Sequence, residues 1–325
     1  MNKSLFFSVA LTLLVWLAWY GYCRPDTLAI VEANWPVSLT MVFGSFIAGA
    51  TSEGGGAIAF PVFTKVLQIA PLEAKVFSLA IQSVGMTAAT LTIVVMRIDV
   101  AWRLVLWASL GGAFGVVFST LLIAPMLEPA LLKMLFTSMV VSFALTLAQL
   151  NWRVRAYNRR LPLFGWPEKA GMLLTGVVGG GMTGLVGNGI DIICFSVMVL
   201  LFRLTEKVST PTSVILMAIN SLVGFMLHVF VIGDFNERVE AYWLAAIPVV
   251  VVGAPLGAYC CTKLNNKMIA TVLIALILIE LFSSLCLIPL TGKIGAVSLT
   301  VFVVFSVIYY LMSRSLRYRP VGEEK

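Results

Sequence analysis

Two stretches of this chain interrupt apolar sequence with glycines and a carboxylate, and together they decide the fold. The first reads GSFIAGATSEGGGAIAFP from Gly44 to Pro61, and the second reads GGMTGLVGNGIDIICFS from Gly180 to Ser196. Glycine inside a helix is less favourable than alanine by about 1 kcal/mol, so a helix is expected to break in each stretch. In a bilayer, broken backbone persists only where protein buries it or where it lines a cavity. Matched breaks in two halves of a membrane protein are typical of a transporter's substrate site.

The composition is that of a polytopic membrane protein. Of the 325 residues, 60% are hydrophobic and 11% are charged, whereas a soluble domain carries about 25% charged residues. The formal net charge of +7 does not indicate a nucleic-acid partner, because the cations lie in short loops between apolar runs. The five cysteines are irregularly spaced and predict neither a disulfide framework nor a metal site. The sequence contains no nucleotide-binding loop or redox motif, and we predict no cofactor and no metal.

Apolar runs of about 20 residues, the length that crosses a bilayer, divide the chain. Eight uninterrupted runs are predicted to be spans, at residues 5–23, 76–96, 104–124, 131–150, 208–232, 241–262, 268–287 and 294–312. The two interrupted stretches, at 37–69 and 170–203, are each long enough for two short legs. They are either re-entrant hairpins or pairs of short spans, and in both cases the chain returns to the side that it left. The run at 5–23 resembles a signal peptide but lacks a cleavage site, so we interpret it as a retained helix.

The distribution of charge predicts the orientation, because basic loops of membrane proteins stay in the cytoplasm. The central linker and the C-terminal tail hold the densest basic clusters, namely Arg153, Arg155, Arg159, Arg160 and Lys169, and Arg314, Arg317, Arg319 and Lys325. Tracing the spans from the linker places the basic loops 97–103 and 203–207 inside and the acidic loop 234–240 outside. We therefore expect a multi-pass protein, in the plasma (inner) membrane, with both termini in the cytoplasm.

The two halves are related by an internal repeat. Gly54 matches Gly189 at an offset of 135 residues, and Ala-Ile-Gln-Ser at 80–83 matches Ala-Ile-Asn-Ser at 218–221 at an offset of 138. Each copy contains a broken-helix hairpin plus three transmembrane helices, and this odd number of legs inverts the second copy. Inverted repeats of this kind form alternating-access transporters. The alternative is chance similarity between helices rich in glycine and alanine.

The predicted fold class is therefore an all-α polytopic membrane protein with two inverted repeats and an extra helix at each end. An N-terminal transmembrane helix and loop occupy residues 1–36, and the first membrane repeat occupies 37–150. A basic cytoplasmic linker at 151–169 leads to the second repeat at 170–290. The last transmembrane helix and a basic cytoplasmic tail occupy 291–325.

The chain resembles the sulfite exporter TauE/SafE family of anion permeases. Its glycine motif is carried here by Gly49, Gly54, Gly55, Gly56 and Pro61 in the first half, and by Gly184, Gly187 and Gly189 in the second. The resemblance covers residues 37 to 290 and implies export or import of sulfite, sulfonates or related small anions. The sequence departs from the family pattern at Ser52, Glu53, Asp191 and Ser196. The carboxylate in each break is not typical of a simple anion site.

The broken segments are the candidate anion site. A helix that starts after a break exposes unpaired N–H groups at the positive end of its dipole, and glycine lets an oxyanion approach the backbone closely. Repeat-related amides on the following helices add side-chain donors, with Ser78, Thr212 and Ser213 nearby. We expect the substrate to be bound by Ser52, Glu53, Gly54, Gly55, Gly56, Gln82, Gly187, Asn188, Gly189, Asp191 and Asn220. The alternatives are that the glycines only let helices cross closely and that the amides only join helices.

Glu53 and Asp191 are acids inside apolar sequence, which makes them functional by default. Burial favours the protonated form of a carboxyl group. A protonated acid donates a hydrogen bond to an anion, and its titration would couple transport to protons. The alternative is that each acid caps a broken helix. The single histidine, His228, is interpreted as a packing residue near the outer end of its helix.

These observations predict a secondary transporter for small sulfur-containing or carboxylate anions, and not an enzyme. Its partners are the small anionic substrate and the lipid bilayer, while the direction of transport, the coupling ion and the oligomeric state stay open. Two other functions also stay open. An intramembrane enzyme would use Glu53 and Asp191 with a path for water, and an anion channel would share the repeat but need a continuous pore.

Overall fold

The computed structural model of the chain describes residues 3–55, 59, 62–151, 157–161, 163–315 and 317–318, and all regular elements within them are helices. The first half contains α1 (Lys3–Cys23), α2 (Thr27–Ala33), α3 (Trp35–Ala50), α5 (Pro71–Val95), α6 (Trp102–Phe118) and α7 (Pro129–Asn151). The second half contains α8 (Trp166–Val186), α9 (Ile190–Ser196), α10 (Glu206–Leu227), α11 (Glu237–Lys263), α12 (Asn266–Leu287) and α13 (Gly292–Arg314). Short helical turns are η1 (Val62–Val66), η2 (Ser119–Ile123), η3 (Ala124–Met126), η4 (Val197–Leu201) and η5 (His228–Ile232).

Eight helical segments of the described chain are long and apolar enough to cross a membrane. They are Pro71–Val95, Trp102–Met126, Pro129–Asn151, Trp166–Val186, Glu206–Ile232, Glu237–Lys263, Asn266–Leu287 and Gly292–Arg314. Every uninterrupted run predicted from the sequence coincides with one of them, except the first. The run at 5–23 is helical as α1, but it is not among the eight, so its crossing stays a prediction.

The broken segments differ from the predicted pairs of short legs. In the first half, α3 has 16 residues and meets α2 at an angle of 77°. In the second half, α8 is a full-length helix of 21 residues, and only the return leg, Ile190–Leu201, is short. The prediction of two short legs is therefore wrong for the second stretch.

Packing explains why the glycines within α8 do not break it. A Cβ atom added at Gly176 would collide with the backbone of Ala108, and one added at Gly180 would collide with the backbone of Gly112. Both targets belong to α6, so these glycines let two helix backbones approach closely. The contact with α6 compensates for the poor helix propensity of glycine.

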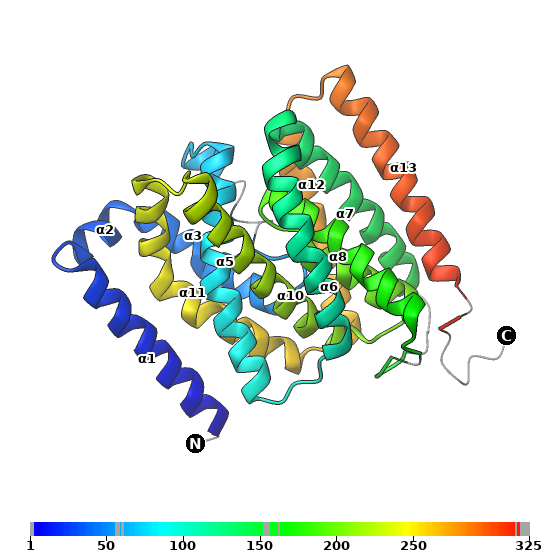
Figure 1. The fold of residues 1–325 in the computed structure, drawn as a ribbon, viewed down its shortest axis with the longest axis horizontal. Coiled ribbons are helices and arrows are strands. Elements are labelled where there is room, and N and C mark those ends of the chain that lie inside the picture. Colours follow the sequence, from blue (N-terminus) through cyan, green and yellow to red (C-terminus); the bar gives the residue numbers. More distant parts are fainter. Residues whose placement is uncertain are drawn as a thin grey trace.

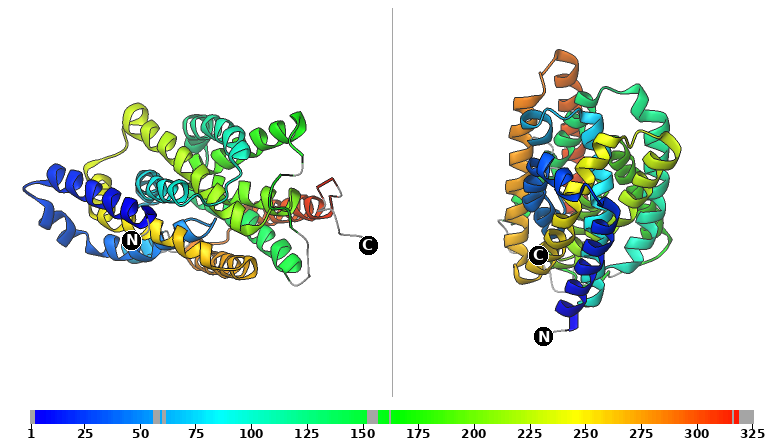
Figure 2. Two further views of the ribbon diagram at one scale, coloured as in Figure 1. Left: turned by 90° about the horizontal axis from the view of Figure 1, so that it is seen from below. Right: turned by 90° about the vertical axis from the view of Figure 1, so that its left-hand side faces the viewer.

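The helices form one bundle with its two terminal helices at opposite edges. Figure 1 shows α1 on one side and α13 on the other, and the first view of Figure 2 places them in the same way. Between them, α6 packs along α8, α3 along α11, and α5 against α10 and α11, while α7 packs against α12 and α13. The largest buried cluster joins the second broken segment to α6, α7 and α10, with Ile190, Phe195, Phe136 and Phe143 at its centre.

The two ends of the bundle differ in charge. One end, which we call the basic end, carries Arg97, Arg103, Arg159, Arg160, Arg203, Lys207, Lys263 and Lys267, and α1 begins and α13 ends there (Figure 1). The other end, which we call the acidic end, carries Glu73, Glu128, Asp234, Glu237 and Glu240, together with the cations Arg24, Arg238 and Lys293. Of the predicted basic clusters, Arg153, Arg155, Arg319 and Lys325 lie outside the described residues.

Hydrogen bonds join the segment after α13 to the linker at the basic end. The Tyr318 hydroxyl donates to Glu168 Oε1 at 2.6 Å, and Arg317 donates to the same oxygen at 2.7 Å. The Asn158 amide donates to the Tyr318 carbonyl at 2.9 Å. Burial and the hydrogen bond to Glu168 raise the pKa of Tyr318 to about 12, so the phenol keeps its proton at neutral pH.

Candidate functional site

The first break lies where α3 ends in the middle of the bundle. From Thr51 to Gly55 the backbone is irregular, and Gly54 has a φ of +73°, a conformation that glycine adopts without strain. Ser52 and Glu53 are buried, with 1% and 0% of their surfaces exposed. The candidate residue Gly56 and the motif residue Pro61 lie outside the described residues.

The second break lies between α8 and α9. Gly187 and Gly189 have φ values of +95° and +145°, which turn the chain between the two helices. Asp191 Oδ1 accepts hydrogen bonds from the backbone N–H groups of Gly189 at 3.2 Å and Ile192 at 3.0 Å. One oxygen of Asp191 therefore caps the start of α9, as the helix-cap interpretation expects. In the described part of the chain, its other oxygen, Oδ2, has no hydrogen-bond partner.

The two breaks face each other. Asn188 Nδ2 donates to the Glu53 carbonyl at 3.5 Å. A Cβ atom added at Gly54 would lie 3.2 Å from Asp191 Oδ2 and 3.7 Å from Gln82 Oε1. The fold thus brings together residues that the sequence separates by more than a hundred positions.

Gln82 joins α5 to the second break. Its Nε2 donates to the Gly187 carbonyl at 3.0 Å and to Ser78 Oγ at 2.7 Å. Ser78 Oγ donates to the same Gly187 carbonyl at 3.3 Å. On the other side of the first break, Ser213 Oγ donates to Ser52 Oγ at 2.9 Å.

Asn220, the repeat counterpart of Gln82, is placed differently. Its Nδ2 donates to the Leu216 carbonyl of its own helix at 2.8 Å. A Cβ atom added at Gly112 on α6 would collide with its Oδ1. These contacts place Asn220 between α10 and α6, which is the arrangement that the helix-joining interpretation expects.

Two further buried charges lie in this region, and the sequence analysis does not single them out. Lys133 on α7 donates to Glu280 Oε1 on α12 at 2.5 Å, and both residues are nearly inaccessible to solvent. The Glu280 carboxyl group is also within hydrogen-bonding reach of the Glu53 carboxyl group. Each residue is a lone charge within a predicted span, so the criterion that selected Glu53 would have found both.

A small cavity, which we call the central cavity, lies between the two breaks. It has a volume of about 40 Å³, and its polar lining consists of Gly55, Ser78, Gln82, Lys133 and Asn188. Apolar side chains from α3, η1 and α5 complete the wall, among them Met41, Phe63 and Phe77. Glu53 and Asp191 do not belong to this described lining. Glu53 lies next to Glu280, and Asp191 lies next to Gly54.

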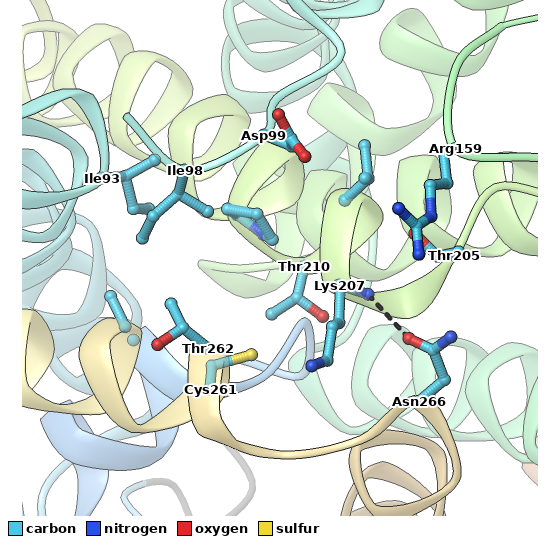
Figure 3. A pocket seen from close by; sticks show the side chains of 14 residues that line it. Ile93, Ile98, Asp99, Arg159, Thr205, Lys207, Thr210, Cys261, Thr262 and Asn266 are labelled. Atoms are coloured by element: carbon cyan, nitrogen blue, oxygen red, sulfur yellow. Dashed lines mark hydrogen bonds between the residues drawn. The ribbon is translucent and has the colours of Figure 1, made fainter. Parts of the chain in front are cut away.

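Larger cavities lie on both sides of the breaks. A cavity of about 330 Å³ reaches from the basic end to Gly49 of α3. Figure 3 shows Lys207, Arg159 and Asn266 on one side of it, with Cys261 and Thr262 of α11 opposite. Among its charged lining residues, Arg159 and Lys207 outnumber Asp99, so the cavity would attract anions toward the breaks.

The acidic end has a cavity of about 400 Å³, and this cavity shares Lys133 and Val186 with the central cavity. His228 lines it and is buried, with its Nδ1 at 2.7 Å from Asp234 Oδ1. Lys75 also lines it, and its Nζ donates to the Gly184 carbonyl at 3.2 Å. His228 therefore has a specific polar partner in addition to the predicted packing role.

Comparison with known proteins identifies the family. The family model of the sulfite exporter TauE/SafE matches residues 37–285, which include both breaks, most of α3 and all helices from α5 to α11. The chain belongs to the sulfite exporter TauE/SafE family. The resemblance predicted from the glycine motifs is thereby confirmed, and the family is one of membrane transporters for sulfite and related anions.

Two other comparisons add little to this assignment. No curated protein matches the chain. A solved structure described as "Crystal structure of protein" shares 15% sequence identity and covers 95% of this chain and 98% of its own. Its TM-score of 0.19 is too low to support any argument about the TauE/SafE fold described above.

Proposed function

We propose that this protein is a secondary transporter that moves small anions across the membrane by alternating access and couples their movement to protons. The substrates are sulfite, organosulfonates or related sulfur-containing or carboxylate anions. The observation that carries the proposal is the central cavity, which lies between the two breaks and is lined by Gln82, Asn188, Ser78 and Lys133.

The lining of the central cavity carries groups that can bind a small oxyanion. Its two amides, its hydroxyl and its ammonium group donate to protein acceptors in this structure and would have to redirect hydrogen bonds to a substrate. A sulfite or sulfonate group offers three acceptor oxygens. A single water needs roughly 10–15 Å³ of such volume, so a cavity of about 40 Å³ has room for an ion of a few heavy atoms. The size therefore favours small anions over large organic substrates.

The position of the central cavity supports alternating access. One larger cavity approaches the breaks from the basic end and another from the acidic end. The Ser52–Ser213 hydrogen bond lies near the first approach, and Lys133 lines the second. Opening one side while closing the other would expose the site to each solution in turn.

The pairing of helices supports the inverted repeat. If α3, α5 and α6 correspond to α8, α10 and α11, then the contact of α6 with α8 has its counterpart in the contact of α11 with α3. Gly115 of α6 matches Gly253 of α11 at the same offset of 138 residues as the Ala-Ile-Gln-Ser motif, and both glycines lie at these contacts. A Cβ atom added at Gly115 would collide with Val177 of α8, and one added at Gly253 would collide with Ser45 of α3. Gly54 and Gly189 also share a positive φ.

Two acids support the coupling to protons. Glu53 and Asp191 are buried at the breaks, and each has an oxygen without a hydrogen-bond partner among the described residues. A negatively charged substrate beside an ionised carboxylate would be repelled. Uptake of a proton by these acids would remove the repulsion, so substrate and proton would bind together.

Transport in sealed vesicles tests this proposal. The purified protein is reconstituted in liposomes, and sulfite, thiosulfate, methanesulfonate and acetate are each supplied with and without an inward proton gradient. We expect at least one sulfur oxyanion to accumulate above its external concentration when the gradient is present. Flux that only follows the anion gradient would indicate a channel, and chemical conversion of the anion without any gradient would indicate an enzyme. Empty liposomes are the control.

A further inference from the structure

Lys133 has a position that sets it apart from the other cations of the bundle. Among the described residues that line the central cavity, Lys133 alone has a charged side chain. It also lines the cavity at the acidic end. Lys133 therefore lies where an anion would pass between the two cavities. A lysine in such a place is costly in a membrane and is expected to act on the transported ion.

One carboxyl group contacts this ammonium group, and two more interact electrostatically with that carboxyl group. Glu280 Oε1 contacts Lys133 Nζ at 2.5 Å, Glu53 lies beside Glu280, and Asp191 is near enough to repel Glu53 electrostatically. Within the described chain, both oxygens of Glu53 and Oε2 of Glu280 have no hydrogen-bond donor. Two carboxyl groups that face each other without a donor repel each other while both are ionised, and a proton shared between them removes this repulsion. The cluster thus contains one cation, several acids and a binding place for a proton.

We propose that Lys133 binds the transported anion, and that Glu280 competes with the anion for it. In the empty site, Glu280 is ionised and holds Lys133. When a proton from water binds to Glu53 and is shared with Glu280, Glu280 no longer holds Lys133 strongly, and Lys133 is released to the anion in the central cavity. This inference rests on the proposed transport function and assigns its coupling site.

The exchange conserves charge and atoms. One proton joins the carboxyl pair and one anion joins Lys133, with no covalent bond to the substrate formed or broken. When the anion leaves, Lys133 returns to Glu280, and the proton leaves the pair. For a singly charged anion, anion and proton cross together without net charge movement.

The charged groups of this cluster come from four packed segments of the chain. Lys133 comes from α7, Glu280 from α12, Asp191 from α9 and Glu53 from the break after α3. The nearest cation on α5, Lys75, donates to the Gly184 carbonyl and lines only the cavity at the acidic end. Lys133 is therefore the residue whose charge an anion in the central cavity would meet.

A purely structural role for the pair makes a different prediction. Replacing both partners of a buried ion pair with hydrophobic residues of similar volume often leaves a protein as stable as before. The double variant Lys133→Met/Glu280→Met should therefore fold. If the pair only joins α7 to α12, this variant should also keep its affinity for anions.

The experiment measures binding heat on purified protein with methanesulfonate and with sulfite, in two buffers of different ionisation enthalpy. The buffer difference gives the number of protons taken up with the anion. Methanesulfonate stays ionised throughout, so its own titration does not contribute. We expect the wild type to take up about one proton per anion, by the binding linkage that the pair creates.

The variants separate the roles of the two residues. Glu280→Gln should bind as well as the wild type or better in alkaline solution and take up less than half as many protons. The double variant should fold, judged by its melting temperature, and bind roughly tenfold or more weakly. Lys293→Gln, which removes an exposed lysine at the acidic end, should match the wild type.

Three other outcomes would each contradict one part of the proposal. Wild-type affinity in the double variant would show that Lys133 does not bind the anion. Wild-type proton uptake in Glu280→Gln would exclude Glu280 from coupling, while leaving the proposed transport intact. Failure of the wild type to bind either probe would overturn the inference together with the proposed substrate class.

Discussion

A carboxyl group that lies away from water needs either a cation or a proton, and the nearest partner of Glu53 is another acid, Glu280. Glu280 already has Lys133 as its cation. Glu53 is therefore the member of the group whose charge is least compensated. At the scale of single residues, this makes Glu53 the acid that a proton reaches first when an anion approaches.

Glu53→Gln tests this assignment. Glutamine keeps the size of the side chain and its hydrogen bonding but does not titrate, so it imitates the protonated acid. We expect the variant to bind anions with less dependence on pH, whereas the wild type should bind better in acidic solution, where the carboxyl group is protonated. Accumulation driven by a proton gradient should be lost. Wild-type accumulation with wild-type pH dependence would show that Glu53 only terminates a helix.

The sequence predicts part of this site and misses another part for a physical reason. Glycines and acids that interrupt an apolar run are a local signal, and they led to Glu53, Gly54 and Asp191, which the fold brings together. Lys133 and Glu280 lie within uninterrupted helices, and their partnership joins positions 147 residues apart. Each is visible in the sequence as an intramembrane charge, but nothing local shows that the two meet.

At the scale of helices, the same glycines have two different effects. Gly187 and Gly189 end α8 because their backbone has positive φ, whereas Gly180, a few residues earlier, stays helical against α6. Sequence alone does not separate these cases, because the deciding factor is the neighbouring backbone. This is why the length of α8 was not predicted.

Adjacent glycines of α8 provide a matched test of this packing. A Cβ atom at Gly180 would collide with the backbone of Gly112, while one at Gly181 meets nothing within 4 Å. We expect Gly180→Ala to destabilise the protein by roughly 1–3 kcal/mol, the typical cost of overpacking. Gly181→Ala should be neutral or stabilising by up to about 1 kcal/mol, because alanine favours the helix. Unfolding in detergent, followed by circular dichroism, measures both. Equal effects would show that α6 and α8 are not in close contact.

At the scale of the whole molecule, the distribution of charge between the two ends of the bundle agrees with the order of the helices. The basic end holds Arg97, Arg160 and Lys207, and the acidic end holds Glu128 and Asp234. If each long helix from α5 to α13 crosses the membrane once, and α9 with η4 returns the chain after α8, then successive connections lie at alternate ends of the bundle. The number and ends of these helices could be predicted from hydropathy because a span must be long and apolar. The bend between α2 and α3 could not, since it depends on packing against α11.

Labelling from outside the cell tests the orientation that the charges predict. Basic loops are retained in the cytoplasm during insertion, so we expect the basic end to face inward and the acidic end outward. Single cysteines are placed at the exposed positions Arg160 and Glu237, in a background with the five native cysteines replaced. A membrane-impermeant maleimide should label position 237 in intact cells, and should label position 160 only after the cells are permeabilised. Because the two halves of an inverted repeat cross in opposite directions, labelling of both positions from outside would contradict the repeat as well as the orientation. Labelling of position 160 alone would reverse the orientation and assign the cavity with Arg159 and Lys207 to the external solution.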